Sequence, residues 1–253
     1  MQPQRLLITA AASGIGLQTA LDIAQSGARV FICDADVWAL QQALEAHPKL
    51  TGMLCDVSDE SQVTALFDQG LLALGGLDVL VNCAGIAGPT ANVAEMDFAA
   101  WRQCLAVNLD GTFLCCRAAA KVMGAQGSGA IINLSSTAGL YGFPRRAPYA
   151  SAKWAIRGLT KTLAQELGPL GVRVTCECPG SVEGESMDRV IAAEAAKTGR
   201  SEQQVRELFT QTASLRTFVS AQDISNTIQF LASAKGARIS GQEIVVDGNT
   251  ETL

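Results

Sequence analysis

Residues 5–34 most constrain what this chain can fold into. Arg5 to Thr9 is a short apolar run and Arg29 to Cys33 is rich in β-branched and aromatic residues, as expected of strands. Between them, a turn of small residues containing Gly14 and Gly16 leads into helical spacing over Leu17 to Ser26. Strand, glycine turn, helix and strand together predict a βαβ unit of a parallel sheet.

The same alternation continues to the end of the chain. Further strands are expected at Thr51–Cys55, Leu77–Val81, Ala130–Leu134, Val172–Cys176 and Glu243–Val246. Helices are expected at Val37–Ala46, Ser58–Leu74, Asp97–Gly124, Pro148–Leu167 and Ser220–Ala232. Loops are short and no Pro- or Ser-rich linker appears, so we expect one α/β domain over residues 1–253.

Composition excludes several classes of protein. A hydrophobic content of 48% with 17% charged residues is typical of a globular protein. The net charge of −5 argues against nucleic acid as a partner. Apolar runs fall short of the ~20 residues of a membrane span, so we expect a cytoplasmic protein. The eight cysteines include no Cys-x-x-Cys pair and there is one histidine, so buried thiols are expected and no metal site.

Tyr149 and Lys153 are candidates for acid–base chemistry. They are four residues apart on a predicted helix, so both side chains lie on one face. A neighbouring ammonium stabilises the phenolate, which is the form of tyrosine that accepts a proton. The pattern is common by chance, and it gains weight only from the rest of the chain.

A nucleotide site is expected at the first glycine turn. The small residues of Thr9–Gly16 let a pyrophosphate approach the start of a helix. Asp34 ends the following strand, where a carboxylate accepts hydrogen bonds from a ribose 2′-hydroxyl and repels a 2′-phosphate. The sequence therefore favours NAD over NADP.

These residues and several later motifs resemble the short-chain dehydrogenase/reductase family over nearly the whole chain. The resemblance is carried, in the family's order, by the Thr9–Gly16 turn, Asp56, Asn82-Cys83-Ala84-Gly85, Asn108, Ser136, Tyr149, Lys153 and Pro179-Gly180. It implies a Rossmann-type, doubly wound parallel sheet of about seven strands in the order 3-2-1-4-5-6-7, with helices on both faces.

The resemblance also implies residue roles. Tyr149 would be the general acid/base, Lys153 would assist it and hold the nicotinamide ribose, Ser136 would bind the substrate oxygen, and Asn108 would hold a water. Ser135 competes with Ser136, which the spacing to Tyr149 favours. The implied NAD contacts are Ser13, Gly14, Ile15, Gly16, Asp34, Asp56, Val57, Asn82, Ala84, Gly85, Tyr149, Lys153, Pro179, Gly180 and Val182.

The implied activity is hydride transfer between NAD(H) and a small, polar secondary alcohol or ketone. Two alternatives stay open: an NADPH-dependent 3-oxoacyl thioester reductase, and an NAD-sensing protein without catalysis. The resemblance also implies a homotetramer, or a homodimer, and no partner other than the small-molecule substrate.

Two positions depart from the family pattern. Ala10 replaces the first glycine of the turn, which we expect to weaken the cofactor site or shift the turn. The segment after Pro179-Gly180 lacks the threonine that often binds the nicotinamide amide; Gly184 stands near its place and Ser186 is a substitute.

Substrate contacts are harder to infer from the sequence. Arg145 and Arg146 are candidates to bind a carboxylate, phosphate or sulfonate, although a solvated or intersubunit basic pair is the favoured interpretation. Two amphipathic helices over Ser186–Ala213, with Met187 on an apolar face, predict either ordinary packing or a mobile lid over residues 183–218.

Overall fold

A parallel sheet forms the centre of the protein. The computed structural model describes residues 4–250, so the ends of the expected 1–253 domain lie outside the described residues. Within that range seven strands form one sheet in the order β3-β2-β1-β4-β5-β6-β7, with every pair parallel. They are β1 (Arg5–Thr9), β2 (Arg29–Asp34), β3 (Leu50–Leu54), β4 (Val79–Asn82), β5 (Gly129–Leu134), β6 (Val172–Pro179) and β7 (Glu243–Val246). The expected fold class and strand order are confirmed.

Helices connect the strands and cover both faces. They are α1 (Gly14–Gln25), α2 (Val37–Ala46), α3 (Glu60–Leu74), α4 (Phe98–Leu105), α5 (Gly111–Gln126), α6 (Ala147–Leu167), α7 (Glu185–Thr198), α8 (Glu202–Gln211) and α9 (Ala221–Ala232). A π-helical turn at Ala106–Asp110 joins α4 to α5, and 3₁₀ turns occur at Val93–Glu95, Thr137–Gly139, Gly168–Leu170 and Ala234–Gly236. No helix within residues 4–250 is both long and apolar enough to cross a membrane.

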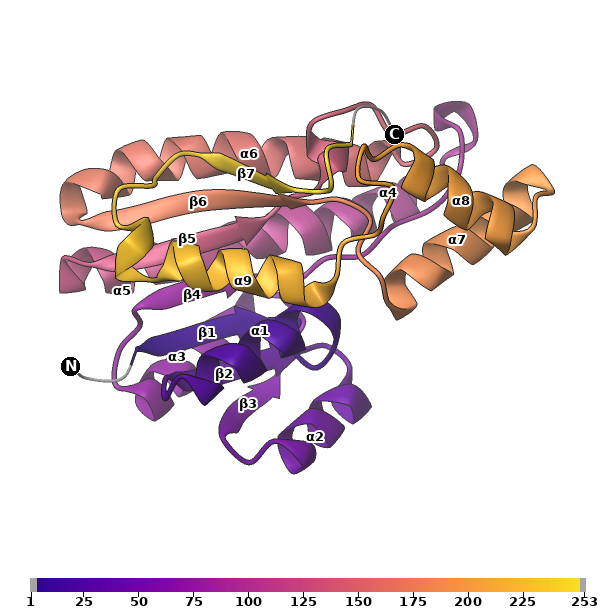
Figure 1. Ribbon diagram of the computed structural model, residues 1–253. Coiled ribbons are helices and arrows are strands. Elements are labelled where there is room, and N and C mark those ends of the chain that lie inside the picture. The colour runs from indigo at the N-terminus through magenta and orange to yellow at the C-terminus, as the bar shows by residue number, and fades with distance from the viewer. Residues whose placement is uncertain (1–3, 251–253) are drawn as a thin grey trace.

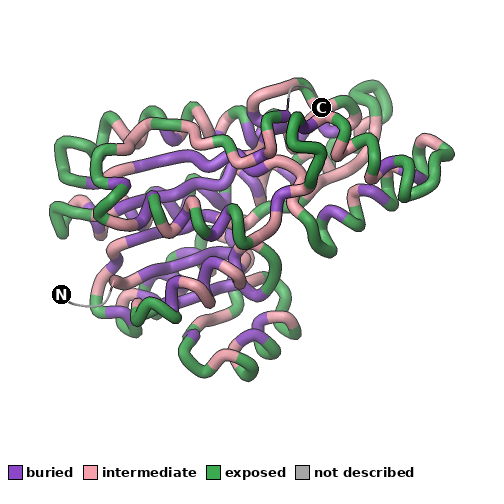
Figure 2. The backbone as a smooth tube through the Cα atoms, in the orientation of Figure 1, coloured by how far each residue is buried: buried purple, intermediate pink, exposed green. Residues whose placement is uncertain are grey.

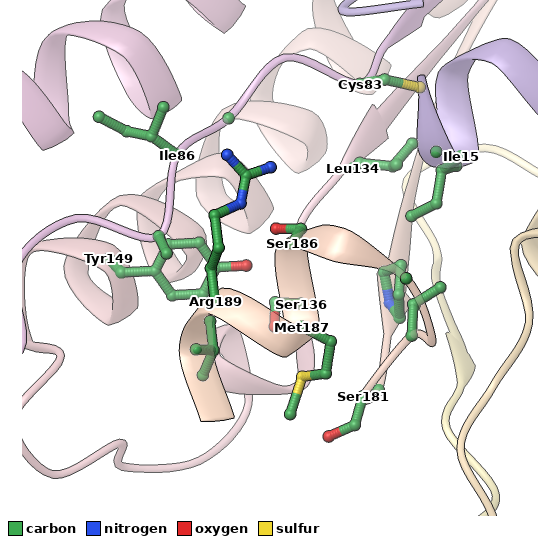
Figure 3. A pocket seen from close by; sticks show the side chains of 18 of the residues that line it. Ile15, Cys83, Ile86, Leu134, Ser136, Tyr149, Ser181, Ser186, Met187 and Arg189 are labelled. Carbon is green, nitrogen blue, oxygen red and sulfur yellow. The ribbon is translucent and has the colours of Figure 1, made fainter. Parts of the chain in front are cut away.

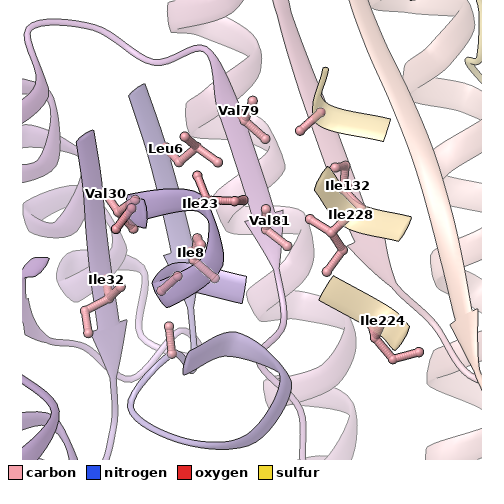
Figure 4. Close-up of a cluster of buried hydrophobic side chains, with 14 of the residues drawn as sticks. Leu6, Ile8, Ile23, Val30, Ile32, Val79, Val81, Ile132, Ile224 and Ile228 are labelled. Atoms are coloured by element: carbon pink, nitrogen blue, oxygen red, sulfur yellow. The ribbon is translucent and has the colours of Figure 1, made fainter. Parts of the chain in front are cut away.

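Two apolar layers hold the helices to the sheet (Figure 1). On one face α1 and α9 lie side by side over the central strands, and Figure 4 shows Ile23 of α1 and Ile224 and Ile228 of α9 against them. On the other face α3, α5 and α6 pack on the sheet, with Leu66 and Met123 fully buried. Figure 2 shows buried backbone concentrated in the strands between these layers. Burial on both faces explains why the strands are almost continuous apolar runs.

Several boundaries differ from the expected ones because local hydrogen bonds override the apolar pattern. Helix α3 starts at Glu60 and not at Ser58, since Asp59 caps it and the Ser58 hydroxyl donates to Asp56. Strand β4 extends to Asn82 and starts only at Val79. Strand β6 runs on to Pro179, three residues beyond the expected end, because it also pairs with β7.

Helices α7 and α8 form a small unit beyond the carboxyl ends of the strands (Figure 1). Met187, Ile191 and Ala195 of α7 pack on Val205 of α8 in an apolar cluster of their own. Ser201 caps α8 with a reciprocal capping box, as its spacing from Gln204 predicts. The unit is joined to the sheet through short segments, which places it beside the carboxyl ends of β5 and β6.

Candidate active site

The glycine turn begins with a strained residue. Ala10 has φ +48°, a left-handed conformation that costs a residue with a Cβ about 1–2 kcal/mol relative to glycine. Gly16 leaves no room for a side chain, because a Cβ there would collide with the carbonyl oxygen of Ala10. The turn is also tied to β4, since Thr9 Oγ1 accepts hydrogen bonds of 3.1 Å from the backbone N–H groups of Cys83 and Ala84. Alanine in place of the family's glycine at position 10 therefore strains the backbone of the turn.

Asp34 lies directly over this turn. Its Oδ2 accepts a hydrogen bond from the Ala12 N–H at 3.1 Å, and its Oδ1 accepts one from the Asp36 N–H at 3.0 Å. Both bonds fix the carboxylate at the carboxyl end of β2, beside the start of α1. A negative charge is thus held where a ribose beside the glycine turn would lie.

Asp56 and Val57, the residues predicted to meet an adenine, are placed by loops. Asp56 Oδ1 accepts from the Ser58 hydroxyl at 2.7 Å, and the buried Val57 packs against Gly111. The Asn82 amide is engaged inside the protein, where it donates to Asn133 at 2.8 Å. Its Oδ1 is buried and has no hydrogen-bond partner among the described residues. The donating half of the Asn82 amide therefore supports the end of β4.

One cavity of about 620 Å³ joins the glycine turn to the catalytic candidates. Figure 3 shows Ile15 and Cys83 at one end and Tyr149 at the other, with Ser136 between them. The predicted site residues that line it are Ser13, Gly14, Ile15, Gly85, Ser136, Arg146, Tyr149, Lys153, Pro179, Gly180, Val182 and Met187. Gly16, Asp34, Asp56, Val57, Asn82, Ala84, Asn108 and Arg145 lie outside this lining.

Helix α6 presents Tyr149 and Lys153 on one face. The Lys153 side chain is almost completely buried, and its Nζ lies 5.5 Å from the centroid of the Tyr149 ring. Nζ donates a hydrogen bond of 2.9 Å to the carbonyl oxygen of Leu134, at the end of β5. The ammonium is thereby fixed between the sheet and the tyrosine.

The two neighbouring serines have different surroundings. Ser135 is buried and its hydroxyl donates to the Lys153 carbonyl oxygen at 2.8 Å. The Ser136 hydroxyl accepts from the Ala138 N–H at 3.1 Å and can still donate to a molecule in the cavity. The geometry supports Ser136, and not Ser135, as the serine that meets the substrate.

Asn108 sits in the π-helical turn between α4 and α5, as the family resemblance implies for a kink at this position. Its amide nitrogen donates to the carbonyl oxygens of Ile86 and Cys104, both at 2.9 Å. Its Oδ1 is buried and has no hydrogen-bond partner among residues 4–250. A Cβ on Gly85 would lie 2.6 Å from this oxygen and 3.4 Å from Lys153 Nζ, so Asn108 and Lys153 face the same small space.

The loop after β6 closes the cavity. Gly180 must be glycine because a Cβ would lie 2.7 Å from Asp247. Val182 bridges to Val219, and Gly184 has φ +136° as it leads into α7. Figure 3 shows Ser186 and Met187 of α7 at the cavity, so Ser186 remains the substitute for the missing threonine.

The two candidate arginines, Arg145 and Arg146, have different surroundings. Arg145 forms an ion pair with Glu194 of α7, on the outside of the cavity. Arg146 is 5% exposed, and its Nη1 donates to the carbonyl oxygens of Ala87 at 3.1 Å and Gly88 at 3.4 Å. The solvated half of the favoured interpretation is wrong for Arg146, because the chain folds the loop after β4 over it; an intersubunit contact stays a prediction.

One cavity residue was missed from the sequence. Arg189 of α7 lines the cavity, and Figure 3 shows its side chain extending from the helix on the side of Tyr149 and Ile86.

A buried acid outside the cavity lining was also missed. Glu177 is fully buried in β6, and both carboxyl oxygens are unpaired within the described residues. Burial, with a smaller contribution from Cys178, raises the pKa of Glu177 to about 9. A glutamate between two cysteines at the end of a predicted strand was the available signal.

The residues present fit a dinucleotide. A Cβ on Gly14 would meet nothing within 4 Å, so the turn leaves open space at the start of α1, where N–H groups favour an anion. The cavity runs from this point to Tyr149, and the buried Asn108 Oδ1 still requires a hydrogen-bond donor.

Comparison with known proteins agrees with this geometry. A family model described as enoyl-(acyl carrier protein) reductase matches residues 9–249. A 2-keto-3-deoxy-L-fuconate dehydrogenase of Xanthomonas campestris pv. campestris is 35% identical over 249 residues, covering 98% of this chain and 80% of that protein.

Solved structures are similar over nearly the whole chain. The NAD⁺-bound structure of a xylitol dehydrogenase has a TM-score of 0.93 and 28% identity, covering 97% of this chain and 98% of that one. An actinorhodin polyketide ketoreductase variant with NADPH has a TM-score of 0.93 and 30% identity, covering 97% and 96%.

Proposed function

This chain belongs to the short-chain dehydrogenase/reductase family, and we propose that it transfers a hydride between NAD(H) and a small, polar secondary alcohol or ketone. One observation carries the proposal: a single cavity is lined at one end by Ser13, Gly14 and Ile15 and at the other by Ser136, Tyr149 and Lys153. Relatives that act on 2-keto-3-deoxy-L-fuconate or xylitol support a small polar substrate.

In this proposal Tyr149 is the general acid/base. NAD, when bound, accepts the hydride that leaves the alcohol carbon. Tyr149 takes the hydroxyl proton during oxidation and returns it during reduction. Lys153 favours the phenolate by holding its positive charge beside the ring, a role supported by its hydrogen bond to Leu134.

Ser136 and Asn108 complete the chemistry. Ser136 donates a hydrogen bond to the substrate oxygen and fixes its position relative to Tyr149. Asn108 Oδ1 accepts from a water that also contacts Lys153, so the proton leaves through the space beside Gly85. The buried, unpaired Oδ1 supports this assignment.

The proposed cofactor contacts extend from beside the cavity into it. The start of α1 would hold the pyrophosphate. Asp34, Asp56 and Val57, which lie outside the cavity lining, would meet the adenosine ribose and the adenine. Gly85, Pro179, Gly180 and Val182 enclose the nicotinamide. The carboxylate of Asp34 supports NAD as the preferred cofactor, because it repels the 2′-phosphate of NADP.

An NADPH-dependent ketoreductase is the second candidate, favoured by the similarity to the actinorhodin ketoreductase. One experiment discriminates between the two candidate functions. The purified protein is incubated with a panel of secondary alcohols and ketones and with each cofactor, and the absorbance of NADH or NADPH is followed. We expect saturable turnover with NAD(H) at a kcat/KM at least tenfold above that with NADP(H). Tight NAD binding without turnover of any substrate would instead favour a sensor.

The family's tetramer is expected here as well, and light scattering measures it.

A further inference from the structure

Arg146 carries a buried charge that forms no direct ion pair with a carboxylate among residues 4–250. It is the residue before the first turn of α6, three positions ahead of Tyr149. Its guanidinium lies 5.9 Å from the Phe143 ring centroid, and burial lowers its pKa from the ordinary arginine value. No carboxylate of residues 4–250 lies within 4.0 Å of it. Buried arginines are normally paired, so this one lacks a partner at the cavity.

Arg189 faces the same cavity from another element, and unlike Arg146 it is exposed to solvent. It lines the cavity from α7, and its Nε donates to the Glu185 carbonyl oxygen at 3.3 Å, one turn earlier in the helix. Its guanidinium also has no carboxylate within 4.0 Å among the described residues. Figure 3 shows the side chain running from α7 toward Tyr149 and Ile86.

Two neighbouring arginines have carboxylate partners. Arg145 pairs with Glu194 and Arg206 pairs with Asp188, and both lie outside the cavity lining. Arg200 and Arg216 also lack a carboxylate within 4.0 Å among the described residues, but only Arg146 and Arg189 line the cavity. Glu183 and Glu185 also line the cavity, but both are exposed and neither lies within 4.0 Å of a cavity-lining arginine.

We propose that Arg146 and Arg189 together bind an oxyanion carried by the substrate, so that the preferred substrates are hydroxy acids and their oxo acids. This rests on the proposed hydride transfer for the reaction, and on the arginine geometry for the anion. A guanidinium donates two parallel hydrogen bonds to a carboxylate or sulfonate, which orients as well as binds it. Arg146 is fixed to the helix of Tyr149, and Arg189 belongs to α7, so the anion joins the α7–α8 unit to the catalytic helix.

Binding of acids that cannot react tests the site without catalysis. Calorimetry measures Kd for pairs of saturated carboxylic acids and their amides, from three to eight carbons, with and without NAD; sulfonates and phosphate monoesters of the best scaffold identify the oxyanion. We expect at least one acid to bind tenfold or more tightly than its amide. Arg189→Gln and Arg146→Gln should each lose tenfold or more for the acid and less than threefold for the amide. The exposed Arg238→Gln is the matched control and should change neither.

The outcomes separate the anion site from other roles. Circular dichroism shows whether Arg146→Gln folds. If it does not, the acid and amide affinities of Arg146→Lys and Arg189→Gln test the anion site instead. Equal affinity of wild type for acids and amides overturns the proposal. An equal loss of affinity for the acid and for the amide in the variants also overturns it, because a merely structural role of the arginines predicts that result. A loss of NAD affinity in Arg189→Gln with an unchanged acid/amide ratio also overturns it, and assigns Arg189 to the pyrophosphate.

Turnover distinguishes this proposal from the proposed function. If wild type oxidises neutral alcohols as well as the matched hydroxy acids, the anion site is wrong and hydride transfer stands. If the acids bind through the arginines but no alcohol is oxidised, hydride transfer is wrong and the anion site stands.

Discussion

The Lys153 ammonium lies 5.5 Å from the centroid of the Tyr149 ring, one turn along the same helix, and donates to the Leu134 carbonyl oxygen at the end of β5. The hydrogen bond ties the charge to the central sheet as well as to its own helix. Because Leu134 directly precedes the serine pair, the same contact also sets the distance from α6 to Ser136.

The two serines give a matched pair of variants. Ser136→Ala should lower kcat by a hundredfold or more, because a donor to the reacting oxygen is lost, and reduce the free energy of unfolding by about 1 kcal/mol through the lost cap. Ser135→Ala should leave kcat within tenfold of wild type and destabilise by about 1 kcal/mol, since its hydroxyl donates to the Lys153 carbonyl. Steady-state kinetics and urea unfolding measure both. A larger loss of kcat in Ser135→Ala would reverse the assignment.

Ala10→Gly should stabilise the protein. The change relieves the φ of +48° and raises the entropy of the unfolded chain, for a net gain of about 0.5–1 kcal/mol in the free energy of unfolding. Gly14→Ala is the counterpart: φ is +53° and a Cβ would meet nothing within 4 Å, so strain alone should destabilise it by about 1–2 kcal/mol. Urea unfolding without cofactor tests both. A stability loss in Ala10→Gly would show that the turn is not strained.

Asp34→Asn tests the choice of cofactor. The amide oxygen still accepts from the Ala12 N–H, which keeps the turn, but the negative charge is removed. We expect kcat/KM for NADP to rise at least tenfold relative to that for NAD, because repulsion of the 2′-phosphate is lost. The exposed Asp68→Asn on α3 serves as the control. An unchanged ratio would mean that Asp34 does not face the ribose.

Glu177 should make stability fall as pH rises. The pKa of Glu177 is about 9 in the native protein, whereas the ordinary value for the unfolded chain is 4.5. Between these pH values the native protein therefore holds a proton that the unfolded chain has released. The free energy of unfolding then decreases with pH by up to about 1.4 kcal/mol per unit. Glu177→Gln should flatten this slope between pH 6 and 9 in urea unfolding. The exposed Glu166→Gln should keep the wild-type slope, and equal slopes in all three proteins would contradict the assignment.

Much of the fold follows from sequence because buried parallel strands and glycine turns leave local patterns. Residues 243–246 form the expected last strand, and Ser201 and Ser220 cap helices as expected. The π-helical turn at Asn108 has no such pattern, because it depends on hydrogen bonds to the distant Ile86 as well as to Cys104.

The substrate end of the site was less predictable for the same reason. Arg146 and Arg189 look like solvated charges in the sequence. Their place at the cavity depends on the loop after β4 and on how α7 packs beside β6, which are contacts between distant segments. Glu177 could have been found as a charge in an apolar strand, but its complete burial follows only from the helices over the sheet.

The central claim is that Tyr149 transfers the proton, and Tyr149→Phe tests it most directly. The variant keeps the ring beside Lys153 and removes only the hydroxyl. With the best alcohol from the substrate panel, kcat should fall by a thousandfold or more, while the Kd for NAD, measured by fluorescence titration, stays within threefold of wild type. A variant that keeps more than about a tenth of wild-type kcat would contradict the account.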